Sequence, residues 1–248
     1  MQTLRGSKSR MNGRWRWMRI DERRGAETAR DYALRVLKSN IISMELKPGA
    51  MVSENELASQ LGLSRTPVRE ALMDLAKYHV VDVLPQRGSR IARIDYALVE
   101  EARFVRQVLE VAILDQVCES ATSVDIAQLR QNVRLQQLSQ EPDMADTLDM
   151  MELDDAFHEM LFRIAHKENA YAMLGGMTIH FDRVRSLALD VVKDNKIIPD
   201  HMEICEAIAA RDAERAKAAM YAHLTRAKVD EDAIRKAYPH YIKGSGRG

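Results

Sequence analysis

The spacing of apolar positions predicts helices along most of the chain, and it first becomes distinctive between residues 53 and 75. Two short apolar faces at helical spacing follow one another there: Leu57, Ala58 and Leu61, then Val68, Leu72 and Leu75. Gly62 separates them, since glycine accepts the left-handed backbone that ends a helix. Ser53 is a predicted N-cap with Glu56 completing a capping box, and Ser64 is predicted to cap the second helix. The pattern therefore predicts a helix-turn-helix.

The next segment changes from helical spacing to the alternation of strands. Residues 80–84 predict one strand, 85–88 a turn and 89–94 a second strand, so that a β-hairpin follows the two helices as a wing. From Asp95 onward the helical period returns without strand alternation. Six helices are predicted, over residues 96–120, 124–138, 145–166, 170–192 with a kink or restart near Gly175, 199–210 and 212–237.

These elements predict a mainly α protein, in which an N-terminal winged helix-turn-helix is followed by an all-α antiparallel helical bundle. We expect a basic disordered tail over 1–24, the winged domain over 25–94, the helical domain over 95–238 and a flexible end over 239–248. The basic, aromatic stretch 14–19 could also be a DNA-contacting arm, and Met18 is a second candidate for the start of translation.

Charge separates the two halves of the chain, although Lys+Arg and Asp+Glu balance at 37 each. Residues 1–93 hold 18 basic and 10 acidic side chains, and the remainder holds 19 and 27. A basic N-terminal half suits binding to a polyanion. The two cysteines make no disulfide framework and no apolar run is long enough for a membrane span, which predicts a cytoplasmic protein.

The start of the second helix carries the chemistry expected of a DNA reader. Arg65 and Arg69 lie four residues apart and project from one side, where arginine can pair with guanine or hold phosphate. Ser64 and Thr66 are expected at the DNA backbone, and Arg87 with Gly88 at the wing tip. The ordinary alternative is a solvated helix with surface arginines.

These motifs resemble the GntR family of bacterial transcription regulators over residues 27–94. The resemblance rests on 46–49, 53–57, 64–72 and Gly88. It implies a homodimer that places one winged helix on each half-site of a double-stranded operator, with Arg65, Arg69 and Gly88 at DNA-contacting positions. Some members have an arginine where this chain has Asn55.

Four side chains of the helical half could hold a metal. Asp154 and His158 are four apart and share one helix face, His201 opens a later helix and His223 lies in the last one. Such an imidazole-rich set suits zinc, nickel, iron or manganese. Spacing alone leaves open that these histidines only pack or face solvent.

Residues 153–158, 200–208, 211–212 and 220–224 resemble the FCD effector-binding domain of the FadR-type GntR regulators, over about 96–235. The resemblance implies that Asp154, His158, His201 and His223 bind a divalent metal, with zinc as the first choice, and that the effector is a small carboxylate or sugar acid. The stretch 106–110 matches the R-x-x-L-E of the first helix, so Arg106 is an expected effector contact, although Phe104 replaces an acidic residue common in the family. Arg183 and Arg185 are further candidates, and Arg185 is preferred.

The main hypothesis is a metabolite-responsive transcription regulator, in the first instance a repressor, and not an enzyme. One alternative is a metalloenzyme with a DNA-binding appendage, in which Asp155 or Glu159 would be the base. The other is a regulator whose helical domain only dimerises.

Overall fold

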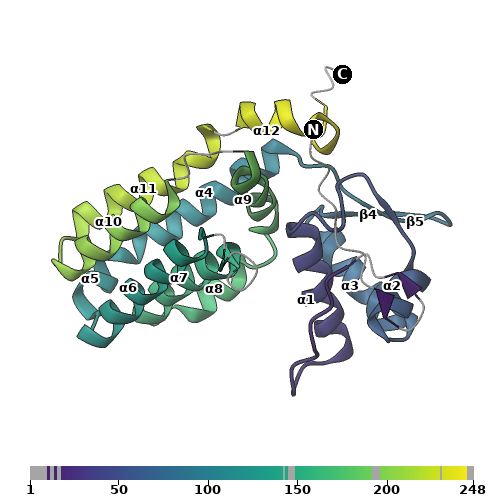
Figure 1. Ribbon diagram of the computed structural model, residues 1–248, viewed down its shortest axis with the longest axis horizontal. Helices are drawn as coiled ribbons and strands as arrows, with labels where there is room; N and C mark the ends of the chain where they lie inside the picture. The colour runs from purple at the N-terminus through teal and green to yellow at the C-terminus, as the bar shows by residue number, and fades with distance from the viewer. Residues whose placement is uncertain are drawn as a thin grey trace. The chain divides into compact units, whose positions relative to one another are not determined.

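The computed structural model describes residues 10–11, 14–15, 18–141, 143–144, 149–191, 196–229 and 231–244. These residues form two compact units that are described separately (Figure 1). The first contains the described residues up to Val99, together with Ile179–Ser186 and those from Arg235 onward. The second contains those of Glu100–Thr178 and Leu187–Ile234. The mainly α class is confirmed. The first unit is not one continuous stretch of sequence, because two later segments belong to it.

The first unit is the winged helix-turn-helix. Its helices are α1 (Ala29–Ile42), α2 (Glu54–Leu61) and α3 (Arg65–Lys77), and α1 packs along α3. Gly62 joins α2 to α3 in the left-handed conformation, with φ of 67°. Ser53 and Ser64 are the N-cap residues, but neither side chain makes a capping hydrogen bond, so the predicted capping box with Glu56 does not form.

A three-stranded antiparallel sheet completes this unit. The predicted wing strands are observed as β4 (Val81–Leu84) and β5 (Gly88–Ile91), and β3 (Met51–Val52) adds to the free edge of β5. The strand β3 was not predicted from the sequence, because two residues are too few to show alternation. A separate antiparallel pair, β1 (Arg10–Met11) with β2 (Arg14–Trp15), lies in the stretch that was expected to be disordered.

The continuously described part of this unit begins at Met18, seven residues before the predicted border. Met18 is buried in the same apolar core as α1 and α3. Asn40 holds the neighbouring backbone from both sides, since its Oδ1 accepts from the Arg19 N–H at 2.8 Å and its Nδ2 donates to the Arg19 carbonyl at 2.8 Å. The Asn40 side chain thus pairs with both backbone groups of Arg19, as a neighbouring strand would.

Two later segments complete the first unit. Ile179, at the start of α9 (Ile179–Val191), is buried in its apolar core, and Arg183 donates to the carbonyl of Ala92 at 2.7 Å. After the 3₁₀ helix η1 (Pro239–Tyr241), Ile242 forms a parallel bridge with Ile94 and is 4% exposed. The end of the chain that was expected to be flexible from residue 239 is therefore paired as far as residue 243.

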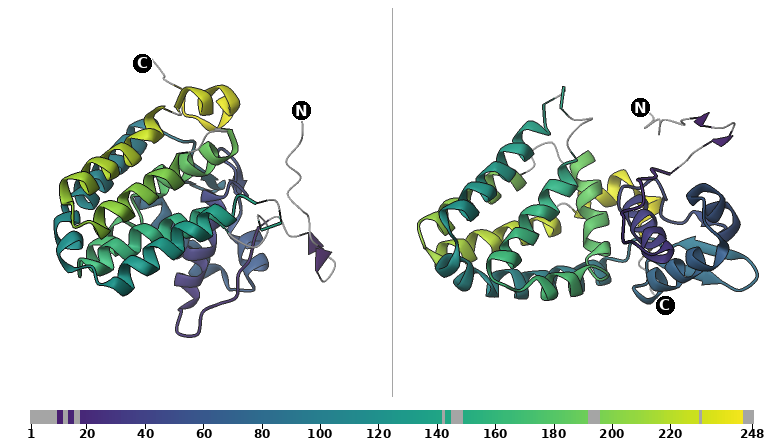
Figure 2. Two further views of the ribbon diagram at one scale, coloured as in Figure 1. Left: turned by 60° about the vertical axis from the view of Figure 1, so that its left-hand side comes forward. Right: turned by 90° about the horizontal axis from the view of Figure 1, so that it is seen from below.

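The second unit is a bundle of helices (Figure 2). Two predicted helices are interrupted by short turns, one near Ile113 and one near Gly175, and only the second of these was expected. The segment 96–120 is two helices, α4 (Tyr96–Ala112) and α5 (Leu114–Ser120), and 170–192 is α8 (Glu168–Leu174) and α9. The segment 212–237 is α11 (Ala213–Val229) and α12 (Glu231–Ala237).

The remaining helices follow the predicted segments more closely. They are α6 (Ser123–Leu138), α7 (Met150–Ile164) and α10 (Ile197–Ala209), of which α10 packs against both α6 and α11. The predicted start of the third helix at Ala145 lies outside the described residues, and the Asp149 side chain caps α7 by accepting from the N–H groups of Met151 and Glu152. Within the described chain, no helix combines the length and apolar character needed to cross a membrane.

Candidate DNA-binding face and metal centre

The outer face of α3 presents most of the predicted DNA-contacting side chains. Ser64, Arg65, Thr66 and Arg69 are all exposed, and the Arg65 side chain is 68% accessible. Val68 and Leu72, on the opposite side of α3, are buried in the core, which orients the helix and turns the arginines outward. The hydroxyl of Ser64 makes no capping bond, so it remains available to a phosphate oxygen.

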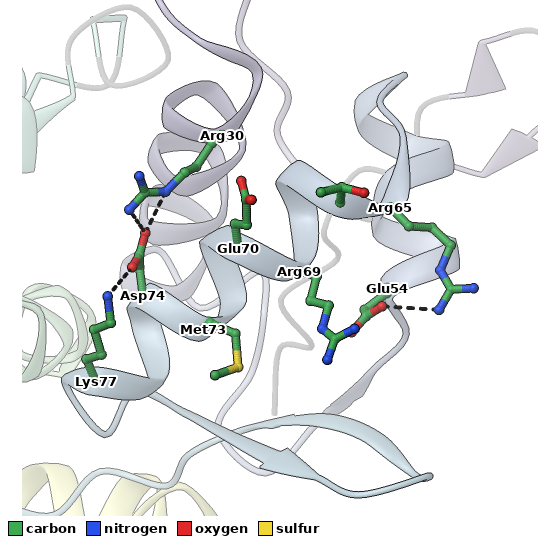
Figure 3. Close-up of a pocket in the computed structure, with 9 residues that line it drawn as sticks. Arg30, Glu54, Arg65, Arg69, Glu70, Met73, Asp74 and Lys77 are labelled. Carbon is green, nitrogen blue, oxygen red and sulfur yellow. Dashed lines mark hydrogen bonds and ion pairs between the residues drawn. The ribbon is translucent and has the colours of Figure 1, made fainter.

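Charge on this face is balanced by local acidic partners (Figure 3). The Arg65 guanidinium lies 3.3 Å from a carboxylate oxygen of Glu54, at the start of α2. Farther along α3, Asp74 accepts from Lys77 at 2.8 Å and from Arg30 of α1 at 2.9 Å. These two hydrogen bonds hold the pKa of Asp74 below its usual range. The carboxylate thereby stays ionised, and its charge is compensated by the two cationic side chains.

The wing places Arg87 and Gly88 at its tip. Both are exposed, and the turn is closed by a hydrogen bond from the Arg87 N–H to the Leu84 carbonyl at 3.0 Å. Gly88 has φ of 90°, and a Cβ there would lie 2.9 Å from the backbone oxygen of Val52. Glycine is therefore required by the approach of β3, whether or not this position also contacts DNA.

Three helices of the second unit bring the four predicted metal ligands together. Asp154 and His158 point the same way from α7, His201 comes from the first half of α10, and His223 from α11. One ligand atom from each lies within 4.8 Å of all the others. Asp154, His158 and His201 are at most 1% exposed, and the His223 side chain is 8% accessible.

The distances between the ligand atoms fit a small divalent ion. Nε2 of His201 lies 3.3 Å from Nε2 of His223, and Asp154 oxygens lie 3.6 Å from Nε2 of His158 and 3.7 Å from Nε2 of His201. Ligands that surround zinc tetrahedrally at about 2.0–2.2 Å are roughly 3.3–3.6 Å apart. Nε2 of His158 is buried and has no hydrogen-bond partner among the described residues, as expected of a ligand atom.

Burial also sets the protonation that a metal needs. Burial lowers the pKa of His158, which favours the neutral ring that offers a lone pair to a metal. Glu110 lies behind this histidine and is itself fully buried. Burial would raise the pKa of Glu110, but the charges and contacts of Arg106 and His158 together outweigh it and hold the value at about 2.

The two predicted effector arginines have different surroundings. Arg106 is 4% exposed, and its Nε donates to Oε1 of Glu110 at 2.6 Å. Arg106 thus forms a buried ion pair with Glu110, next to the candidate metal ligand His158. Arg185 is 7% exposed and donates to Asp182 at 2.9 Å, in the part of α9 that belongs to the first unit. Arg183, the less preferred candidate, is fully buried.

The residues behind the histidines, namely Glu110, Gln136 and Asp200, were not predicted as part of the site. Glu110 ends the R-x-x-L-E match, which indicated a role only for Arg106. Gln136 follows Leu129 and Val133 at helical spacing on the buried side of α6. A polar side chain at such a position needs a buried hydrogen-bond partner, and this could have indicated its role from the sequence. Asp200 directly precedes a predicted ligand and is ion-paired with Arg226 across to α11.

Comparison with known proteins identifies both units. Residues 32–91 match the bacterial regulatory proteins of the gntR family, and residues 101–226 match the FCD domain. The chain is 35% identical over 216 residues to an HTH-type transcriptional regulator in an unstable DNA locus of Streptomyces ambofaciens, covering 87% of this chain and 89% of that one. It is 34% identical over 191 residues to the HTH-type transcriptional repressor RspR of Escherichia coli, covering 77% and 83%.

Solved structures agree on the fold. McbR/YncC of E. coli matches with a TM-score of 0.71 at 21% identity, over 85% of this chain and 99% of that one. A GntR transcriptional regulator from Rhodococcus matches with a TM-score of 0.66 at 23% identity, over 84% and 98%. The relatives are transcription regulators rather than enzymes, which removes the metalloenzyme alternative. The chain therefore belongs to the GntR family and is a DNA-binding transcription regulator with an FCD domain.

Proposed function

We propose that this regulator is a homodimeric repressor whose FCD domain binds a divalent metal, zinc in the first instance, and a small carboxylate or sugar acid that changes operator affinity. The observation that carries the proposal is the buried convergence of Asp154, His158, His201 and His223 from three helices. A cluster of three imidazoles and one carboxylate, closed off from water, has little use in a bundle core other than ligation.

The effector class follows from what a metal with four protein ligands still lacks. An octahedral ion such as nickel, manganese or iron has two further positions, which a carboxylate with a neighbouring hydroxyl or carbonyl oxygen can fill. Zinc can likewise expand its coordination beyond four. Arg106, one side chain behind the centre, adds positive charge near any such anion. An effector changes DNA affinity only if it binds one arrangement of the protein better than another.

DNA recognition is proposed to use Ser64, Arg65, Thr66 and Arg69 of the helix-turn-helix with Arg87 and Gly88 of the wing. Replacing Arg65 and Arg69 together by alanine should abolish sequence-specific binding to an operator selected from the host genome, because each arginine that pairs with a base contributes about 1–3 kcal/mol of discrimination. Titration at fixed salt measures the loss. Arg130→Ala is the matched control, since Arg130 is an exposed, ion-paired arginine of the second unit. Equal operator affinity of the double variant and the control would refute this assignment.

The effector proposal is tested by thermal unfolding of metal-loaded and metal-stripped protein against a panel of small carboxylates and sugar acids. A ligand at one hundred times its Kd stabilises the bound unit by about 2.7 kcal/mol, which gives a readable shift. We expect a hit only in the metal-loaded form, and its loss in His201→Ala. Stabilisation that is equal with and without metal would contradict a metal-bound effector. If the protein contains no metal even after incubation with divalent ions, the alternative in which the helical domain only dimerises would be favoured.

A further inference from the structure

The Nδ1 atoms of the three histidines point away from the candidate metal centre, and their surroundings bear on which tautomer each ring adopts. A neutral imidazole has one N–H and one lone pair, and only the nitrogen with the lone pair can bind a metal. In His158, His201 and His223 the atoms that converge are all Nε2. Nδ1 of each ring therefore has to carry the proton if all three are to act as ligands together.

Each Nδ1 faces a different side-chain oxygen that could accept a hydrogen bond from its N–H. Nδ1 of His158 lies 2.5 Å from Oε2 of Glu110, a contact short enough for a charge-assisted hydrogen bond although it is not aligned as one. Nδ1 of His201 lies 2.9 Å from Oε1 of Gln136. Nδ1 of His223 lies 3.6 Å from Oδ2 of Asp200, which is slightly longer than a hydrogen bond.

The three oxygens are themselves held in place. The second oxygen of Glu110 accepts from Nε of Arg106 at 2.6 Å. The Gln136 amide donates to Oδ1 of Asn132 at 2.7 Å, which fixes its own oxygen toward His201. Asp200 accepts from Arg226 through both oxygens, with Nη2 to Oδ1 at 2.7 Å. Every acceptor thus has a second partner that prevents it from rotating away.

The free-energy cost of burying the Glu110 carboxylate argues against a role in core packing alone. A fully buried carboxylate is expensive unless it is paired, and a buried ion pair gains little over apolar residues of the same volume. The same helix could have closed this part of the core with leucine. The Arg106–Glu110 pair is intelligible if its carboxylate orients the ring of His158.

We propose that Glu110, Gln136 and Asp200 are positioning residues of the metal centre, which hold His158, His201 and His223 as Nδ1–H tautomers with Nε2 toward the ion. Glu110 is the strongest of the three, because it is charged, fully buried and closest to its histidine. The inference rests on the metal site of the proposed function. Partners of this kind typically change metal affinity by 10–100-fold when they are mutated.

Glu110→Gln is the central variant. Glutamine offers one acceptor and one donor, while Arg106 and the Nδ1–H of His158 both need an acceptor, so one of the two contacts is lost. We expect the Kd for zinc, measured by competition with a coloured chelator, to rise 10–100-fold. Nitrogen NMR of the imidazoles should show His158 losing its uniform Nδ1–H state, a change that mere loosening of the helix does not produce.

Two further variants protect the test. Gln136→Met removes the acceptor at His201 without changing charge or much volume, and it should weaken zinc binding even if Glu110→Gln folds poorly. Glu206→Gln is the matched control, since Glu206 pairs with Arg130 at the surface. Zinc binding and tautomers that equal wild type in both core variants would overturn the positioning role and leave the metal site intact. Failure of the wild-type protein to bind zinc would overturn the site and this inference together.

Discussion

Gly88 shows how a single position can be fixed by its backbone. Its φ of 90° and the 2.9 Å that would separate an added Cβ from the Val52 oxygen leave no room for a side chain. We predict that Gly88→Ala lowers the free energy of unfolding of the first unit by about 1–3 kcal/mol, since the left-handed strain and the displacement of β3 add together. Urea unfolding followed by circular dichroism measures the loss.

Two other glycines calibrate this prediction. A Cβ on Gly62 meets nothing within 4 Å although φ is 67°, so Gly62→Ala isolates the conformational cost at about 1–2 kcal/mol. Gly25 has open space around it and no such backbone, and its alanine variant should change stability by no more than about 0.5 kcal/mol. Equal stability of Gly88→Ala and Gly62→Ala would show that the close approach of β3 adds no cost.

At the scale of elements, the helix-turn-helix and the wing were predictable because their signals are local. Gly62 ends α2, the apolar faces fall at helical spacing, and the β-hairpin has its own turn. The four candidate metal ligands, which the structure brings together, could be named from motifs in the same way. Their supporting residues could not, because Gln136 and Asp200 reach their histidines through the packing of α6, α10 and α11. The break near Ile113 was obscured since apolar residues continue through it, whereas the restart near Gly175 was predicted.

The most distant pairing in the first unit was also invisible to pattern analysis. Ile242 is 4% exposed, and the Ile94 N–H donates to the carbonyl of Tyr241 at 2.8 Å. We predict that Ile242→Ala costs about 2–5 kcal/mol, the usual range for a buried isoleucine, and that the Ile94 amide exchanges faster with solvent. Hydrogen exchange measured by NMR reports both effects.

The control for that measurement is Val83→Ala, because Val83 lies on β4 and is 45% exposed. It should leave exchange at Ile94 unchanged. If Ile242→Ala also leaves this amide protected, the C-terminal segment contributes no stability to the first unit.

For the whole molecule, the separation of charge predicts where the salt dependence of DNA binding originates. Each phosphate neutralised by a basic side chain steepens the fall of log K with log salt by about 0.9. We predict that Arg69→Ala lowers this slope by about 1 for each bound chain. Arg65→Ala should lower the slope less. Arg65 is paired with the Glu54 carboxylate in the free protein, so when it moves to a phosphate the net charge gained at the DNA is smaller and fewer counterions are released.

Titration of the selected operator between about 50 and 200 mM salt is the measurement. Arg130→Ala, in the acidic second unit, should leave the slope at its wild-type value. A slope that responds equally to Arg69 and Arg130 would mean that non-specific attraction, rather than α3, dominates the approach to DNA.

The first unit is assembled from three separate stretches of chain, and this limits how the protein can be cut and recombined. A fragment that ends at Ile94 would lack Ile179 from its apolar core and Ile242 from its last strand-like pairing. Exchanging the N-terminal DNA-binding segment between relatives at that border would therefore leave it against a foreign α9 and a foreign C-terminal segment. A working chimaera would have to carry the first turns of α9 and the C-terminal segment along with the head, so the exchangeable module is defined in space and not by one continuous length of sequence.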